Sequence, residues 1–370
     1  MRPTSLVINL DALRHNVIQV KSSIGSAQLM AVVKANAYGH GLIESAKILE
    51  KSGADYFGVA LVEEGIALRQ SGITKPILVF GAVFPEQIGL FLQHNLEITA
   101  ASVDKLKAIN QVAQSASKQA IVHLKIDTGM ERVGIHDYSS PKFALALKEC
   151  PNCIIKGVYS HFARSEEKDL SFTRVQLERF QKCLLYFKEA GIEIPIKHIA
   201  NSGGLLQLPE AHLDLVRCGI CLYGLAPTRE LSRKLDLRPV MSLHSKVAYF
   251  KVVQPGATVS YGGTWQAKKQ TRVVTVPLGY GDGYSRRLSN HGSVLIRGER
   301  YPIIGNVCMD QMMVDIGEGT AYNGDEVVLI GKQGEQEISI FDIAEQIGTD
   351  PRDVMVSANE RIPRVYLGGL

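Results

Sequence analysis

Several polar side chains in this sequence follow short apolar runs that are typical of buried strands. The first is Lys34, which ends the apolar run 29–33 and precedes a small-residue segment, 35–41. Active sites of α/β folds gather at the carboxyl ends of parallel strands, so an amine there is well placed for chemistry. A lysine taken out of water becomes a nucleophile for carbonyl compounds. Lys34 therefore suggests a Schiff base with an aldehyde, either a sugar or pyridoxal phosphate; the alternative is a lysine that simply leaves the strand into water.

Further polar side chains occupy the same position, at or near the end of a predicted strand. They are Lys125, Asp127, His161, Asn201, Ser202 and Arg217. Loops after the seventh and eighth strands of a closed barrel commonly bind phosphate through backbone N–H groups. Ser202 and the pair Gly219 and Ile220 lie in those two loops. This placement favours a phosphorylated aldehyde, and pyridoxal phosphate fits best.

The elements that must position these residues alternate between strand and helix over the first two-thirds of the chain. The predicted strands are 29–34, 55–60, 76–81, 97–100, 121–127, 154–161, 197–201 and 213–220. Residues 171–190 carry an apolar stripe at helical spacing, and 63–70 and 103–116 show weaker versions of it. Eight such units predict a (β/α)8 TIM-type barrel, with a doubly wound open sheet as the alternative.

The character of the sequence changes near residue 237. Beyond it, Gly and Pro punctuate short alternating runs, at 245–253, 272–278, 293–296, 301–305, 312–316 and 326–330. These runs predict a C-terminal antiparallel β domain with one late helix near 340–347. We therefore divide the chain into a barrel over 9–237 and a β domain over 238–370, which residues 1–8 join as a further strand.

Composition narrows the class of protein. The 370 residues are 45% hydrophobic, and 41 basic minus 37 acidic side chains give a net charge of +4. The charges are scattered, so no nucleic-acid partner is expected, and neither a membrane helix nor a signal-peptide core is visible. The Cys-x-x-Cys pairs at 150–153 and 218–221 are too far apart for one zinc site, so we expect free thiols and no metal. A cytoplasmic protein is the expectation.

The sequence resembles the alanine racemases over about residues 5–366. The matching motifs lie at 31–41, 125–132, 160–163, 201–202, 217–224, 259–262, 279–283 and 308–310. Each motif alone is weak, but together and in this order they are specific. The resemblance implies an enzyme that uses pyridoxal phosphate to interconvert L-alanine and D-alanine, and so supplies D-alanine for peptidoglycan.

The resemblance also implies a role for individual residues. Lys34 would hold the cofactor and act as one of two bases, and Tyr261 of the partner subunit's β domain would be the other. The enzyme would thus be a homodimer with shared active sites. A phenol gives up its proton near neutral pH only in a positive field, which His161 and Arg217 are expected to supply.

Other roles concern the cofactor and the substrate. Arg217 would face the pyridine nitrogen without releasing its own proton, and Arg132 and the backbone N–H of Met309 would bind the substrate carboxylate. Lys125 is a possible carbamylated lysine, with an ordinary Lys125–Asp127 ion pair as the alternative. The predicted cofactor-binding residues are Lys34, Tyr38, His161, Asn201, Ser202, Arg217, Gly219 and Ile220.

Two positions depart from the pattern of the relatives. Glu360 stands where some relatives have a phosphate-contacting tyrosine, and Asn306 stands where some have an arginine in the substrate channel. The alternatives to an alanine racemase are a broad-specificity amino acid racemase, a decarboxylase of the same two-domain type, and a pyridoxal phosphate carrier or regulator. Arg217 argues against the decarboxylase, and the full β domain with Tyr261 argues against the carrier.

Overall fold

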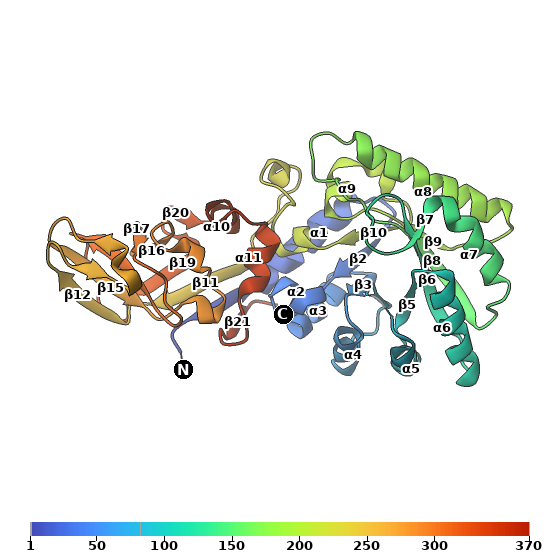
Figure 1. Cartoon of the computed structure of the whole chain (residues 1–370), viewed down its shortest axis with the longest axis horizontal. Helices are drawn as coiled ribbons and strands as arrows, with labels where there is room; N and C mark the ends of the chain where they lie inside the picture. The colour runs from blue at the N-terminus through green and yellow to red at the C-terminus, as the bar shows by residue number, and fades with distance from the viewer. Residues whose placement is uncertain (1, 82, 370) are drawn as a thin grey trace. The chain divides into compact units, whose positions relative to one another are not determined.

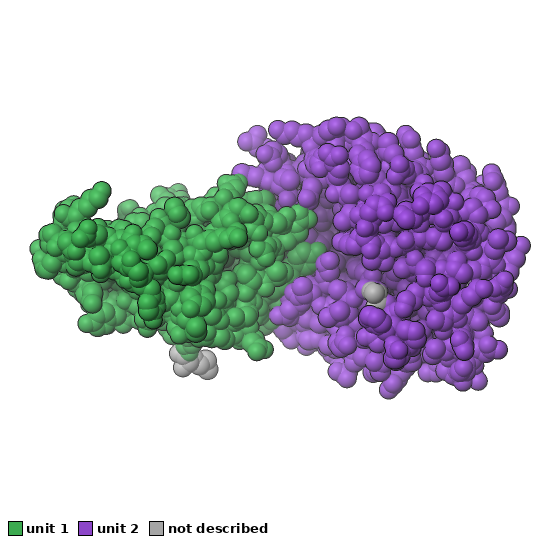
Figure 2. Space-filling model, in the orientation of Figure 1, with its two compact units in different colours: residues 1–11, 38–41, 239–370 green, residues 12–37, 42–238 purple. Residues whose placement is uncertain are grey.

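The computed structural model describes residues 2–81 and 83–369, which form two compact units (Figure 2). The barrel unit comprises residues 12–37 and 42–238, and the β unit comprises residues up to Asp11, the short segment 38–41 and residues 239–370. Each unit has a hydrophobic core of its own, and the two are described separately below.

Among the described residues, eight parallel strands form the barrel, in the order β10-β2-β3-β4-β5-β6-β8-β9, and the two-residue β7 (Ile135–His136) pairs with β6 outside this order. The eight strands are β2 (Gln28–Val32), β3 (Tyr56–Val59), β4 (Ile77–Val79), β5 (Glu97–Ala100), β6 (Ala120–Asp127), β8 (Cys153–Tyr159), β9 (Ile196–His198) and β10 (Leu215–Cys218). The seam between β9 and β10 is bridged by backbone bonds from Asp214 N to Lys197 O (3.1 Å) and from Arg217 N to Ala200 O (3.0 Å). The pairing of β10 with β2 confirms the predicted barrel, and the doubly wound alternative is wrong.

Helices surround these strands on the outside (Figure 1). They include α3 (Leu42–Lys51), α4 (Val62–Gln70), α5 (Ile88–Gln93), α6 (Val103–Ser115), α7 (Ser140–Leu147), α8 (Ser171–Glu189) and the short α9 (Ser202–Gln207). The predicted stripe on α8 buries Phe180, Cys183 and Phe187, because residues three and four apart share one face of a helix. The barrel interior is filled by Met30, Tyr56, Leu78, Tyr159, Ile196 and Leu215, so it is a packed core rather than a channel.

The β unit is built on one long sheet, in the order β12-β15-β18-β17-β16-β19-β11-β1-β21, with β20 (Gln336–Ile338) beside β19. Its strands are β12 (Tyr249–Val253), β15 (Thr271–Val276), β18 (Met312–Gly317), β17 (Glu299–Ile304), β16 (Ser293–Ile296), β19 (Glu326–Gln333), β11 (Met241–Lys246), β1 (Ser5–Asn9) and β21 (Arg364–Leu367). All pairs in it are antiparallel except β1 with β21. The predicted strand 245–253 is two strands, because residues 247–248 carry the chain from a pairing with β19 to a pairing with β15.

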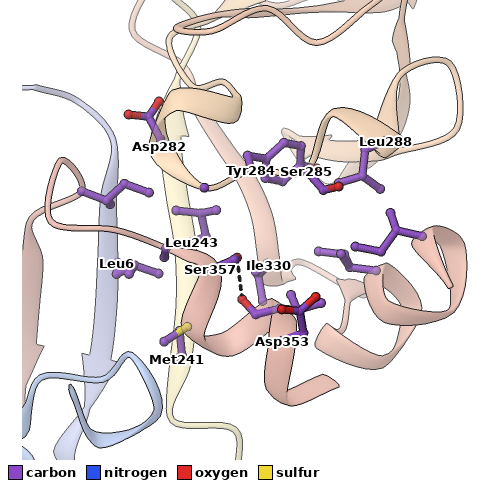
Figure 3. A pocket seen from close by; sticks show the side chains of 16 residues that line it. Leu6, Met241, Leu243, Asp282, Tyr284, Ser285, Leu288, Ile330, Asp353 and Ser357 are labelled. Atoms are coloured by element: carbon purple, nitrogen blue, oxygen red, sulfur yellow. Dashed lines mark hydrogen bonds between the residues drawn. The ribbon is translucent and has the colours of Figure 1, made fainter. Parts of the chain in front are cut away.

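An apolar cavity of about 220 Å³ lies within the β unit, beside α10 (Ile340–Ile347) and α11 (Pro351–Ser357) (Figure 3). Leu6, Leu243, Leu288 and Ile330 contribute to its wall, and the Ser357 hydroxyl at its edge donates to Val354 O (2.9 Å). Of the helices in the described residues, none combines the length and the apolar character that crossing a membrane requires.

Candidate functional site

Lys34 lies two residues beyond the end of β2 and is partly buried. The residues that follow it form α2 (Lys34–Tyr38), in which Ala35, Asn36 and Ala37 have φ values of 52°, 54° and 54°. This is a left-handed turn, which costs L-residues about 1–2 kcal/mol each. Backbone strain of this kind persists only where the surroundings enforce it, and it clusters at functional sites.

Two side chains of the barrel unit hold the left-handed turn in place. Glu64, in the first turn of α4, accepts from Ala35 N (2.7 Å) with one oxygen and from Ala60 N (2.8 Å) with the other. Asn36 accepts from Leu42 N (2.8 Å), and Asn tolerates this backbone region better than most residues. Nothing in the sequence distinguishes Glu64 from any other acidic residue near a helix start, so its role was not predicted.

The loop after β6 is shaped by Asp127. One of its carboxylate oxygens accepts from Gly129 N (2.8 Å) and Met130 N (2.9 Å), and the other accepts from Arg132 N (3.2 Å). Burial acts to raise the pKa of Asp127, but these backbone N–H groups outweigh it and the pKa is lowered. The loop therefore fixes the backbone of Arg132, whose side chain is exposed.

Lys125, in contrast, is a buried cation on β6. Its ammonium donates to Ile126 O (2.8 Å), and within the described chain it makes no ion pair with Asp127. Burial and, after it, the positive charge of Arg217 lower the pKa of Lys125 to about 7, with Asp127 opposing. The amine is thus about half neutral near pH 7, which is the form that reacts with electrophiles.

Arg217 lies on β10 and is 4% exposed. It donates to Ser160 O (2.7 Å), Ile199 O (2.9 Å) and His198 Nδ1 (3.0 Å), and no carboxylate of the described residues pairs with it. Burial lowers the pKa of Arg217 to about 10, so it remains a cation near neutral pH. His198, one of its partners, is a residue of the site that the sequence did not single out.

His161 also contacts Arg217, through Nδ1 (3.1 Å). Burial and then the charges of Arg217, Lys125, Arg132 and Lys34 lower the pKa of His161 well below its usual value. The expectation that His161 supplies positive charge is therefore wrong, because it is neutral at physiological pH. The charges of four basic side chains therefore act on one imidazole, as expected where the strand ends of a barrel converge.

The loops after β9 and β10 meet through Ser202. Its hydroxyl accepts from Gly219 N (3.1 Å), and Ile220 follows directly. Asn201 accepts from Gly204 N (3.0 Å) and from the Ser165 hydroxyl (2.7 Å), so its side chain organises the loop. Tyr38 ends the left-handed turn after Lys34 and is assigned to the β unit.

Tyr261 lies in the loop of a small hairpin between β13 (Thr258–Val259) and β14 (Trp265–Gln266), and is 73% exposed. The hairpin packs on the sheet through Val259 and Trp265. Before Tyr261, Ser260 has φ 68° and ψ −179°, a conformation that is nearly confined to glycine. Asn306 stabilises this conformation. Its backbone carbonyl accepts from the Ser260 hydroxyl (2.5 Å), and its side-chain amide donates to Tyr261 O (2.7 Å).

The structure places the two residues that depart from the family pattern, Asn306 and Glu360. Asn306 anchors the backbone of the Tyr261 loop. Glu360 is exposed, as is Met309 (53%), which follows Cys308 in the loop between β17 and β18.

Known proteins match this chain over nearly its whole length. The sequence profile "Alanine racemase, N-terminal domain" matches residues 8–227, and "Alanine racemase, C-terminal domain" matches residues 240–366. The alanine racemase of Carboxydothermus hydrogenoformans is 46% identical over 369 residues, which cover 99% of this chain and 100% of that protein.

Solved structures agree. The alanine racemase from D-cycloserine producing Streptomyces lavendulae superposes with a TM-score of 0.96 at 35% identity, covering 100% of this chain and 98% of that one. A histidine racemase from Leuconostoc mesenteroides subsp. sake also superposes, with a TM-score of 0.91 at 29% identity, covering 99% and 98%. Two profiles that match residues 8–227 and 240–366, and a full-length relative well above 30% identity, establish that this chain is an isomerase of the alanine racemase family.

Proposed function

We propose that this protein interconverts L-alanine and D-alanine with pyridoxal phosphate, as a homodimer in which Lys34 of one subunit faces Tyr261 of the other. The observation that carries the proposal is the buried cation Arg217, which contacts His161 (3.1 Å) and pairs with no carboxylate of the described residues. A buried guanidinium without a carboxylate partner is costly, so the mouth of the barrel, where the carboxyl ends of its strands meet, suits an anionic ligand. A phosphorylated aldehyde and an amino acid carboxylate both meet that requirement.

The residues present fit pyridoxal phosphate. When bound, this group supplies an aldehyde for an amine and a conjugated ring that stabilises negative charge at the substrate α-carbon. Lys34 would bind the aldehyde, and Arg217 would donate to the ring nitrogen without giving up its proton. The phosphate would be held by Tyr38, Ser202 and the backbone of Gly219 and Ile220. His161 and Asn201 would complete the cofactor site.

Racemisation requires that a proton leave one face of the α-carbon and return to the other face. Two proton-transfer groups must therefore stand on opposite sides of the substrate. Lys34 is one of them, and the phenol of Tyr261 is the other. Arg217, rather than the neutral His161, would provide the positive charge that favours the phenolate.

Large exposed side chains of the β unit support a dimer in which a second subunit covers them. Tyr261 (73%), Met309 (53%) and Tyr280 (42%) are large and exposed, and their loops are joined by bonds from Asn306 to Tyr261 and from Gly281 N to Met309 O (2.8 Å). Apolar side chains exposed together in this way indicate an interaction surface. A second copy of this chain would cover it, and bring Tyr261 and the Met309 N–H to the partner's barrel.

Lys125 is expected to be carbamylated. Its pKa of about 7 makes the neutral amine about a thousandfold more abundant at pH 7 than for an ordinary lysine. The resulting anion would orient Arg132 toward the substrate carboxylate, and Lys125→Met should lower kcat/KM about 10- to 100-fold. Since the amine must lose its proton, activity should rise with pH through about 7, and this rise should be absent in Lys125→Met.

A carbon-13 NMR spectrum of protein equilibrated with labelled bicarbonate checks this directly. A carbamate signal is expected in the wild type and not in Lys125→Met. A wild type without the carbamate signal, and with a pH profile like that of Lys125→Met, would exclude the carbamate.

The lowered pKa of Lys125 also affects stability. The unfolded chain binds more protons than the folded chain between about pH 7 and 10.5, so the free energy of unfolding of the wild type should increase with pH across that window.

A racemisation assay with alanine, serine, lysine and histidine tests the proposed function. Alanine should have the highest kcat/KM, and borohydride should abolish both activity and the cofactor's absorbance. Comparable rates with all four amino acids would favour a broad-specificity racemase, which the likeness to a histidine racemase makes worth testing. Release of carbon dioxide without racemisation would indicate the decarboxylase. In the cell, we propose that the enzyme supplies D-alanine for peptidoglycan from the cytoplasm.

A further inference from the structure

A continuous line of polar side chains crosses the packed interior of the barrel. Glu97 stands at the start of β5 and is 5% exposed, while His123 on β6 and His198 on β9 are fully buried. Glu97 Oε2 lies 2.8 Å from His123 Nε2, and His123 Nδ1 lies 3.0 Å from His198 Nε2. His198 Nδ1 then lies 3.0 Å from Arg217 Nη1. The line links Glu97, at the amino end of β5, to the Arg217 guanidinium at the mouth of the barrel.

The direction of every hydrogen bond in this line is determined by its last member. An arginine can only donate, so His198 Nδ1 must accept and His198 Nε2 must carry the hydrogen. His198 Nε2 then donates to His123 Nδ1, and His123 Nε2 donates to the Glu97 carboxylate. A doubly protonated His123 would leave His198 without a nitrogen that could donate or accept correctly. Both imidazoles are therefore neutral, with one tautomer each.

Neutral imidazoles leave two charges, the Glu97 carboxylate and the Arg217 guanidinium, at opposite ends of the line. Buried carboxylates are rare unless they are paired. Within the described part of the chain, the other hydrogen bond to the Glu97 carboxylate is a long one, from the Tyr56 hydroxyl (3.4 Å). Arg69 attracts Glu97 through space, but its N–H groups donate to backbone carbonyls, among them Ile73 O (2.9 Å) and Asn95 O (3.0 Å).

Neighbouring residues of the barrel leave room for this line of side chains and pack against it. Gly157 lies opposite His123 in the pairing of β6 with β8, and a Cβ at Gly157 would come within 2.3 Å of His123 Nδ1. Tyr159 stacks on His198 with ring centroids 4.8 Å apart and planes 13° apart. The same ring lies 5.3 Å below the Arg217 guanidinium carbon. Both imidazoles are thus held in one orientation by their neighbours.

We propose that Glu97 and His123 are positioning residues that act through His198 on Arg217. The carboxylate selects one tautomer in each imidazole, which keeps His198 Nδ1 as an acceptor and directs the remaining N–H groups of Arg217 to the mouth. It also offsets the guanidinium charge across the barrel. The proposal rests on the proposed function for its effect on catalysis, but the coupling of Glu97 to His198 does not depend on that function.

Three variants of the full-length dimer separate this role from a purely structural one. Glu97→Leu removes both charge and acceptor, Glu97→Gln keeps an acceptor for His123, and Tyr56→Phe removes the other contact of Glu97 and serves as the control. Nitrogen-15 NMR of histidine-labelled protein, assigned with single histidine variants, reports the protonation of each imidazole. Steady-state kinetics with alanine give kcat and KM.

In the wild type, His123 and His198 should each carry hydrogen on Nε2 only. In Glu97→Leu the signals of His198 should change, although the two side chains do not touch, and kcat should fall roughly 10- to 100-fold while KM changes less than about threefold. Glu97→Gln should restore the wild-type histidine signals and part of kcat. Tyr56→Phe should match the wild type throughout.

The proposal is overturned if either wild-type imidazole carries hydrogen on Nδ1, a result that needs no variant to fold. It is also overturned if the His198 signals are unchanged in Glu97→Leu, or if Tyr56→Phe loses as much kcat as Glu97→Gln. A wild type that does not racemise alanine but shows the coupled histidine signals would reject the proposed function and retain the coupling.

Discussion

Replacing Lys34 with alanine is expected to lower alanine racemisation by more than about 10⁴-fold, because one amine provides both the covalent attachment of the cofactor and a proton-transfer group. The barrel should still form, since Lys34 lies beyond β2 and the turn after it is held by Glu64 and Asn36. The measurement is kcat/KM in both directions, with absorbance to follow cofactor attachment.

A matched control is Lys47→Ala, which removes another lysine of the barrel unit. Lys47 lies on α3, and its one ion pair within the described residues is with Glu44 (3.2 Å). The variant should retain full activity. If Lys34→Ala kept more than about one part in a hundred of the wild-type rate while folded, Lys34 would be a phosphate or solvent contact rather than the reacting amine.

Replacing Tyr261 with phenylalanine should reduce racemisation about 10²- to 10⁴-fold, the usual contribution of a single proton-transfer group. The ring is kept, and the bond from Asn306 is to the backbone carbonyl of residue 261, so the loop should not move. Since the two enantiomers are equal in energy, kcat/KM must fall equally in both directions. Steady-state rates alone therefore do not show which base was lost.

Exchange of the α-hydrogen with heavy water distinguishes the two bases. With Tyr261→Phe, D-alanine should still exchange its α-hydrogen through Lys34 without inversion, whereas L-alanine should not exchange. Equal exchange from both enantiomers would mean that Tyr261 does not serve the L face, and Tyr280→Phe, an exposed tyrosine of the same unit, provides the comparison.

The fold could be predicted from the sequence because its signals are local. Apolar runs of four to eight residues between turns gave all eight barrel strands, and the alternating runs after residue 237 gave the sheet of the β unit. The division of 245–253 into β11 and β12 could not be predicted, because it depends on two different pairing partners, β19 and β15. The parallel pairing of β1 with β21 likewise joins the two ends of the chain.

The candidate site was predicted where a polar residue interrupts an apolar strand end, as at Lys34, Lys125 and Arg217. The residues that support these side chains could not be predicted. In the sequence, Glu64 and Glu97 look like ordinary acidic residues, and only the fold brings them to their partners. The charge state of His161 was mispredicted for the same reason. Its low pKa results from burial and from basic residues on four different segments, which no local pattern reveals.

Mixing two inactive variants tests the central claim most directly. Lys34→Ala and Tyr261→Phe subunits, dissociated, combined and reassembled, should form hybrid dimers with one intact site each, and restore about a quarter of the wild-type activity in an equal mixture. Purified hybrids carrying two different tags should have half of the wild-type rate. Hybrids that assemble and remain inactive would contradict a site in which the amine of one chain faces the phenol of the other.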